Sequence, residues 1–224
     1  MTGLFAWPQG ARFDQRVPRD RLFAQAGGGK TIRALYADQV ERITWTHKLF
    51  ERSINLALGD GVEEIVVLEV ALKGDRLDDK VLAHIDAALP RHTLFELRRG
   101  AEAAMAVAYK RQDESDASRM VVGPHVRQEW QPEDGPRVPL PPATHLGSLY
   151  AGLLRSLWPH PHRTGESLRD QAERVAAAMV ERRKVDRMAG CVRRETSFAR
   201  QVELNRELRE AQRRLAALTQ MKDA

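Results

Sequence analysis

The feature that most constrains the fold is a run of almost continuously apolar residues from Glu64 to Lys73. The run is rich in valine and isoleucine, whose β-branched side chains favour a strand over a helix. A strand that lacks polar alternation is covered on both faces, as central strands of α/β proteins are. One carboxylate, Glu69, interrupts the run, and a charge at a buried position is costly unless it is paired. We therefore expect a central strand that carries an ion-paired glutamate.

The segments on either side of this strand predict its neighbours. Residues 42–49 alternate in polarity and predict a strand whose one face carries Ile43, Trp45, His47 and Leu49. Residues 74–90 have helical spacing and end at a proline, so they predict a helix.

Two further strands, over residues 92–99 and 103–111, are separated by Gly100, which is typical of a hairpin. The order of strand, helix, strand and strand predicts an α/β fold with a mixed β-sheet core and packed helices. An α+β arrangement is the alternative. Residues 1–30 predict irregular structure, and a proline-rich connection at 131–144 precedes a short helix at 145–157.

The C-terminal segment predicts a pair of helices, over residues 166–189 and 192–220, with a break at Gly190. Apolar residues follow alternating spacings of four and three in both helices, which is the pattern of a coiled-coil seam. In the second helix the seam residues are Leu204, Leu208, Ala211, Leu215 and Leu218. An antiparallel helical hairpin is the first interpretation, and a seam that pairs between two chains is the alternative. The expected domains are an α/β core at 1–160 and a basic helical hairpin at 161–224.

Positive charge is concentrated in this C-terminal segment. Residues 1–160 hold 21 Lys and Arg against 21 Asp and Glu, whereas residues 161–224 hold 15 against 10. The predicted contact residues for nucleic acid or an acidic partner, expected at one end of the hairpin, are Arg182, Arg183, Lys184, Arg187, Arg193, Arg194 and Arg200. A basic cluster of this kind suits phosphate or carboxylate. The alternative is an ordinary solvated helix surface.

Composition argues against disulfide-bonded, cysteine-ligated metal and membrane-spanning proteins. The single cysteine, Cys191, excludes an internal disulfide and a multi-cysteine metal site. No apolar run approaches the roughly 20 residues that span a bilayer, and we expect a cytoplasmic protein without a membrane partner. No cofactor or metal site is predicted from motifs.

One catalytic hypothesis rests on charged residues of the core strands. Glu69 and Lys73 share a strand face by their spacing, and Glu96 lies on the following strand. Carboxylates and a lysine at a sheet edge could serve a metal-dependent nuclease with Mg²⁺. The competing interpretation is a structural ion pair of Glu69 with Lys73 or Arg98, which we favour because such networks imitate catalytic ones.

Three segments together carry a family resemblance. They are VERITWTHKLFERSINL at 40–56, EEIVVLEVALKG with IDAALPRHTLFELRRG and AVAYKR between 63 and 111, and RRETSFARQVELNRELREAQRRLAAL at 193–218. The chain resembles the bacterial family known as domain of unknown function 4391. The resemblance implies no catalytic residues. It does imply that the gene lies beside genes for restriction-type helicases and DNA methyltransferases in bacterial antiviral defence clusters.

These observations give a leading hypothesis and two alternatives. The leading hypothesis is an accessory component, not itself an enzyme, of a DNA-targeting, restriction-modification-like defence system. It would dock on a helicase or methyltransferase and could contact DNA through the tip of the basic hairpin. A metal-dependent nuclease subunit is the first alternative, and a self-assembling structural protein that forms homo-oligomers is the second.

Overall fold

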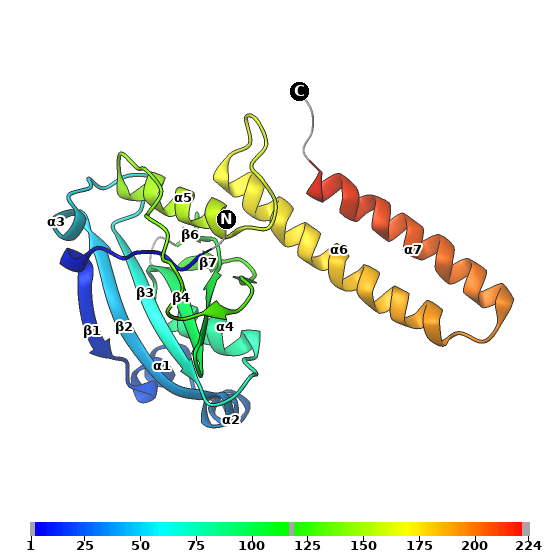
Figure 1. Ribbon diagram of the computed structural model, residues 1–224, viewed down its shortest axis with the longest axis horizontal. Helices are drawn as coiled ribbons and strands as arrows, with labels where there is room; N and C mark the ends of the chain where they lie inside the picture. Colours follow the sequence, from blue (N-terminus) through cyan, green and yellow to red (C-terminus); the bar gives the residue numbers. More distant parts are fainter. Residues whose placement is uncertain (1–2, 117–118, 221–224) are drawn as a thin grey trace. The chain divides into compact units, whose positions relative to one another are not determined.

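The structure, a computed structural model, describes residues 3–116 and 119–220 (Figure 1). The chain divides into two compact units, Met1–Leu157 and Trp158–Ala224. We describe the first as the body and the second as the hairpin unit. In the described part of the chain, no helix combines the length and the apolar character needed to cross a membrane.

A mixed sheet forms the centre of the body. Among the described residues it has seven strands, in the order β1-β2-β3-β4-β5-β8, with β9 also paired to β5. These strands are β1 (Arg12–Arg16), β2 (Val40–Phe50), β3 (Glu64–Leu72), β4 (His92–Arg99), β5 (Glu102–Val107), β8 (Val126–Arg127) and β9 (Gln131–Pro132). Strands β3 and β4 run parallel, and the other pairs are antiparallel. This confirms the predicted α/β class, the mixed sheet and the hairpin at Gly100.

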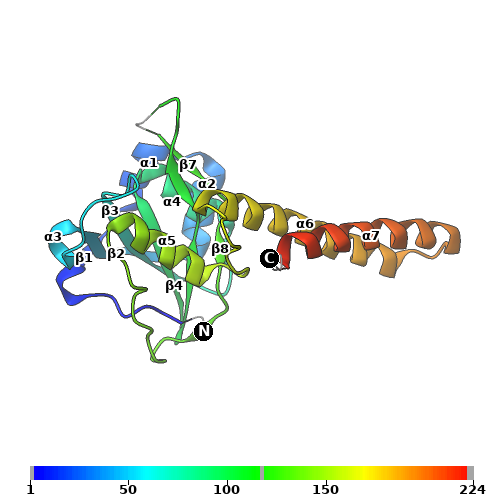
Figure 2. The same cartoon turned by 90° about the horizontal axis from the view of Figure 1, so that it is seen from above.

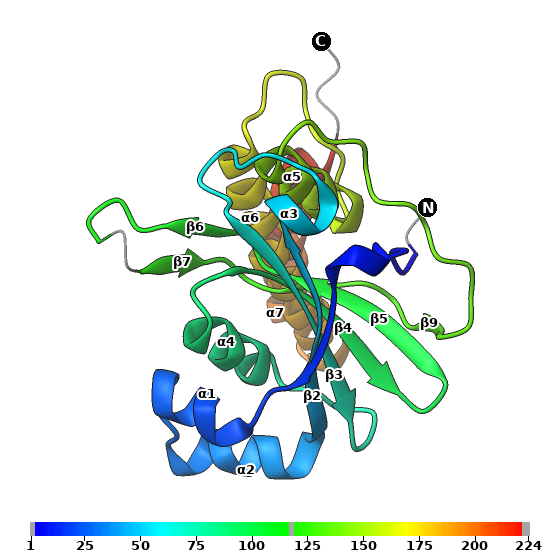
Figure 3. The same ribbon diagram turned by 90° about the vertical axis from the view of Figure 1, so that its left-hand side faces the viewer.

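Helices cover the sheet. They are α1 (Arg19–Ala26), α2 (Lys30–Gln39), α3 (Glu51–Ile54), α4 (Asp79–Ala88) and α5 (Leu146–Leu157), with the short 3-10 turn η1 (Gln9–Ala11). Figure 3 shows α1, α2 and α4 together on one side of the sheet and α5 away from them. The side chains of Val66, Leu68 and Val70 on β3 pack under α1, α2 and α4 in one apolar core. A small separate sheet pairs β6 (Lys110–Gln112) with β7 (Met120–Val122).

The N-terminal region is more regular than predicted, since it contains β1 and α1. Strand β1 adds to the edge of the sheet although all five of its side chains are exposed, so no buried apolar pattern marks it. The segment before it pairs with the proline-rich connection: the Ala6 amide donates to the Val138 carbonyl (2.7 Å), and the Val138 amide donates to the Leu4 carbonyl (2.8 Å). Two segments far apart in the sequence are thereby fixed side by side.

A bulge in β2 corrects the predicted face assignment of that strand. Trp45 lies opposite Leu68 and His47 lies opposite Val67, so the register shifts between them. One extra residue reverses the face of everything that follows it in the strand. Trp45 accordingly packs on the core beneath α1, α2 and α4, whereas His47 faces the other side of the sheet.

The hairpin unit consists of two helices, α6 (Leu168–Arg194) and α7 (Phe198–Thr219), which lie side by side in Figures 1 and 2. The predicted break at Gly190 is wrong, because Gly190 lies inside α6 and the turn falls at residues 195–197. A glycine costs a helix only about 1 kcal/mol, which 27 helical residues easily absorb. The seams pair within the chain: Ala178, Ala211 and Leu215 are buried, and Arg214 reaches Glu181 at 3.4 Å.

Candidate functional site

A charged hollow of about 300 Å³ lies on the sheet face opposite the α1–α2–α4 core. Three neighbouring strands contribute to it, because their side chains on this face point the same way. The N-terminal segment and the proline-rich connection form its remaining walls. The lining residues are Ala6, Trp7, Thr46, His47, Glu69, Glu96, Arg98 and Arg137. Two of the three candidate catalytic residues, Glu69 and Glu96, therefore meet at one site.

Glu69 and Glu96 are register partners on the parallel strands β3 and β4. Their exposed fractions are only 9% and 4%, so each carboxylate needs a cation beside it. Arg98 supplies this to both: it lies 2.8 Å from Glu69 and 3.4 Å from Glu96. Arg98 also pairs with Glu133, and Arg42 approaches Glu69 at 3.3 Å. The predicted structural ion pair is thus present, with Arg98 as one of its cations.

Arg137 binds the Glu96 carboxylate in a bidentate contact. Its two terminal nitrogens donate to the two oxygens of Glu96, at 3.1 and 2.8 Å, and Trp7 Nε1 donates at 3.3 Å. Burial raises the pKa of Glu96, but the hydrogen bonds and charge of Arg137, with help from Trp7 and Arg98, outweigh it and lower the pKa below 4.5. Trp7 comes from the N-terminal segment and Arg137 from the proline-rich connection. By accepting hydrogen bonds from both residues, Glu96 links these two segments to the sheet.

His47 also lines the hollow. Burial lowers the pKa of its imidazole below 6.5, although Asp14 and Glu96 act in the opposite direction. Its Nδ1 atom is buried and has no hydrogen-bond partner among the described residues. The position of the ring follows from the bulge in β2.

Lys73, the third catalytic candidate, does not join this site. Its amine donates to the Ala37 carbonyl at 2.6 Å, at the end of α2. Lys73 follows the last residue of β3, so the predicted shared face with Glu69 does not bring the two together. Across residues 3–116 and 119–220, no group of three or more His, Cys, Asp and Glu side chains is arranged to hold a metal ion. The nuclease hypothesis remains a prediction with two of its three residues in one place, both engaged by arginine.

A second charged cluster, which the sequence did not reveal, lies entirely inside the body. Lys110 and Asp86 have fully buried side chains and meet at 2.8 Å, and His125 Nε2 contacts the other oxygen of Asp86 at 2.7 Å. Lys110 also donates to the carbonyl of Leu89 (3.0 Å) and the hydroxyl of Thr93 (3.3 Å). Burial lowers the pKa of Lys110, while Asp86 opposes that shift. The cluster ties α4 to β6 and to the segment before β8, and no sequence pattern links these positions.

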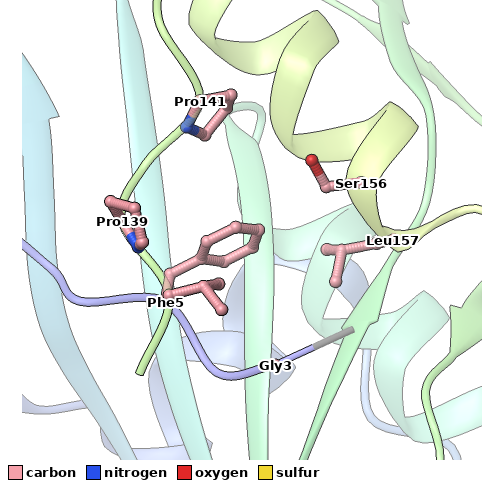
Figure 4. Close-up of a pocket in the computed structure, with 7 residues that line it drawn as sticks. Gly3, Phe5, Pro139, Pro141, Ser156 and Leu157 are labelled. Carbon is pink, nitrogen blue, oxygen red and sulfur yellow. The ribbon is translucent and has the colours of Figure 1, made fainter. Parts of the chain in front are cut away.

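A smaller hollow of about 210 Å³ is shown in Figure 4. Phe5, Pro139, Pro141 and Leu157 give it apolar walls. Among the described residues, its only side-chain hydroxyl belongs to Ser156, which donates to the Gly152 carbonyl within α5 at 2.8 Å. No titratable side chain of a described residue lines it, so these residues offer packing space but no acid, base or activated nucleophile.

The predicted basic residues lie along the hairpin rather than in one cluster. Arg193 and Arg194 occupy the last turn of α6, not the start of the return helix as predicted. The segment Arg182–Arg187 begins three turns earlier, because 11 helical residues extend about 16 Å. Arg200 pairs with Glu203 at 2.6 Å. Within the described residues, five of the predicted seven take part in no ion pair: Arg182, Lys184, Arg187, Arg193 and Arg194.

Three more arginines, which were not among the predicted contact residues, share the outward face of α7. Arg206, Arg209 and Arg213 are spaced at three and four residues and are all exposed. Arg206 lies 3.6 Å from Glu210, whereas Arg209 and Arg213 take part in no ion pair with a described residue. Their spacing matches that of the leucine seam on the opposite side of the helix, and this could have identified them.

Comparison with known proteins places the chain in a family. No curated protein and no solved structure matches it. One family model does match, over residues 5–215, which include nearly all of both units. The chain therefore belongs to the family described as Domain of unknown function (DUF4391).

Proposed function

We propose that the protein is an accessory component of a bacterial DNA-targeting defence system and binds DNA along the outward faces of its hairpin. A helicase or methyltransferase subunit is the proposed partner of the body. The observation that carries the DNA contact is the set of hairpin arginines, Arg209 and Arg213 among them, that take part in no ion pair with a described residue. The defence context rests on the resemblance alone.

The charge of the hairpin supports a phosphate contact. Residues 180–214 carry eleven Lys and Arg against six Asp and Glu, which matches the net charge of +5 for the whole chain. Arg209 and Arg213 lie four residues apart on one helix face, a separation of about 6 Å along the axis. Successive phosphates of a strand are spaced similarly, and an unpaired guanidinium gives up no protein contact when it binds one.

A salt-dependent binding measurement tests this proposal. Labelled 30-base-pair DNA would be titrated with the full chain, and then with Arg209→Glu/Arg213→Glu and Arg182→Glu/Arg187→Glu variants. We expect a loss of affinity on the order of tenfold or more for at least one variant, and a slope of log affinity against log salt reduced by about 2. The matched control is Arg76→Glu/Lys80→Glu, which reverses two exposed cations of the body.

The outcomes are separable. Equal affinity of both hairpin variants and the wild type would exclude the hairpin as a DNA contact. An equal loss in the body control would show that net charge alone drives binding.

A nuclease assay addresses the alternative. Incubation of plasmid DNA with Mg²⁺ or Mn²⁺ would compare the wild type with Glu69→Ala. We expect no metal-dependent cleavage, because the ion pairs with Arg98 and Arg42 already engage Glu69. Cleavage that disappears in Glu69→Ala would instead support the nuclease.

A further inference from the structure

The end of the hairpin carries an exposed apolar surface that neither the seam nor a DNA contact explains. Phe198 and Val202 lie four residues apart in the first two turns of α7, with exposed fractions of 80% and 53%. We call these two side chains the tip patch. Residues at i and i+4 lie on the same face of a helix, so the two form one continuous surface.

The tip patch is not required by the pairing of the two helices. The seam of α7 runs through Leu204, Leu208, Ala211 and Leu215, and its buried members are Ala211 and Leu215. Helical spacing puts Phe198 and Val202 on the opposite face, in line with Arg206, Arg209 and Arg213. A large aromatic side chain that serves no packing role and stays in water is a mark of an interaction surface.

Cations and carboxylates surround the tip patch. Arg193 and Arg194 end α6 across the turn and have no ion pair among the described residues. Of the two nearby carboxylates, Glu203 pairs with Arg200 at 2.6 Å, whereas Glu195 accepts a hydrogen bond from the Ser197 amide at 2.9 Å and keeps its charge. Three arginines, Arg193, Arg194 and Arg200, against these two glutamates leave a net charge of +1 beside the patch.

The apolar surface and the positive charge together favour one of three binding partners for the tip patch. A second copy of the chain docked tip to tip would bring the unpaired Arg193 and Arg194 of both copies together, and like charges disfavour that contact. A DNA duplex would satisfy the arginines, but its phosphate surface offers nothing apolar to Val202. A protein segment with an apolar anchor and acidic flanks satisfies both.

We propose that the tip patch docks an acidic amphipathic segment of a partner protein. Apolar side chains of that segment cover Phe198 and Val202, and its carboxylates pair with Arg193 and Arg194. This inference rests on the proposed accessory role but not on the DNA contact, because the DNA-binding arginines lie along the helices and the patch lies at their joined end. The hairpin then links a partner protein at its tip to DNA along its sides.

Site-specific photo-crosslinking in the cells that produce the protein tests the inference. Phe198 would be replaced by p-benzoylphenylalanine, and the crosslinked peptide identified by mass spectrometry. The matched control carries the same replacement at Val180, which is 63% exposed on α6 and lies away from the tip. We expect a crosslink at position 198, and not at 180, to a segment of another protein that contains both carboxylates and apolar side chains.

The identified segment, made as a synthetic peptide, gives the quantitative arm. We expect Phe198→Ser/Val202→Ser and Arg193→Glu/Arg194→Glu each to weaken its binding at least tenfold, with Val180→Ser unchanged and the affinity falling as salt rises. A crosslink to nucleic acid, to a second copy, or equally at both positions would overturn the inference, as would unchanged binding in the tip variants. The DNA affinity of Phe198→Ser/Val202→Ser, measured in the same preparation, separates this failure from failure of the proposed DNA contact.

Discussion

Arginine plays opposite roles in the body and in the hairpin. In the body, Arg98 pairs with the carboxylates of Glu69, Glu96 and Glu133, and both terminal nitrogens of Arg137 donate hydrogen bonds to Glu96. In the hairpin, Arg209 and Arg213 project from the outward face of α7 without an ion pair among the described residues. The difference teaches that the charge excess of the hairpin is not needed to hold its helices together. Removing one partner of a buried ion pair is costly because the other charge stays buried, whereas removing an exposed charge changes stability little.

The largest expected effect comes from the buried cluster of the body. Asp86→Ala should lower the free energy of unfolding by about 3–5 kcal/mol, because it leaves the Lys110 ammonium buried without its carboxylate. The matched control on the same helix is Asp79→Ala, whose exposed pair with Arg127 should contribute at most about 1 kcal/mol. Urea unfolding followed by circular dichroism measures both. Similar losses for the two variants would contradict the comparison.

The next largest effect is expected when an arginine is replaced by methionine in the body, and the same substitution in the hairpin is its comparison. Arg98→Met should lower the free energy of unfolding by about 2–4 kcal/mol, since Glu69 and Glu96 would lose a shared cation while buried. Arg209→Met should change it by no more than about 0.5 kcal/mol. Thermal unfolding of the two variants is a sufficient measurement. A destabilising Arg209→Met would show that the hairpin arginines are structural.

The pH dependence of stability isolates Glu96. Its folded pKa is lowered, so its contribution is complete above the ordinary value of 4.5 and is lost as the pH falls through the folded value. Glu96→Gln should lower the free energy of unfolding at pH 7 by about 2–3 kcal/mol and make the loss of stability below pH 4.5 less steep. Urea midpoints between pH 3 and pH 7 test this. An acid limb as steep as in the wild type would assign the pH dependence to other carboxylates.

The smallest expected effect has the opposite sign. Gly190→Ala should stabilise the hairpin by about 0.5–1 kcal/mol, because Gly190 lies within α6 and an added Cβ would meet only the Arg194 side chain, at 3.9 Å. Amide hydrogen exchange of α6 residues near position 190 reports this locally. Faster exchange in the variant would place a turn at Gly190 after all.

Local patterns in the sequence predicted most of the elements. The apolar run of β3, the hairpin of β4 and β5 at Gly100, and the two helical seams were recognisable because each depends on the spacing of neighbouring residues. The C-terminal charge excess was likewise readable. The end of α6 was not, because helix propensity tolerates Gly190 and the stop comes from the turn at 195–197.

The candidate site was predictable only in part. The position of Glu69 within an apolar run indicated a paired carboxylate, and spacing placed Glu96 on the next strand. Arg137, which binds Glu96, lies 41 residues after Glu96 in the chain, and Trp7 lies 89 residues before Glu96. No periodicity links such positions, since only the pairing of the N-terminal segment with the proline-rich connection brings them to the sheet.

The sequence by itself therefore determined the α/β class, the order of the central elements and the separation of a neutral body from a basic hairpin, because these follow from local periodicity and from composition. The tertiary structure decided which charges are paired. The bulge in β2 turned His47 into the hollow, the packing of α4 joined Asp86 to Lys110 and His125, and the outward faces of the hairpin left Arg209 and Arg213 free of ion pairs among the described residues. The physical reason is that an ion pair depends on distance in space, which the spacing of residues along the chain does not specify.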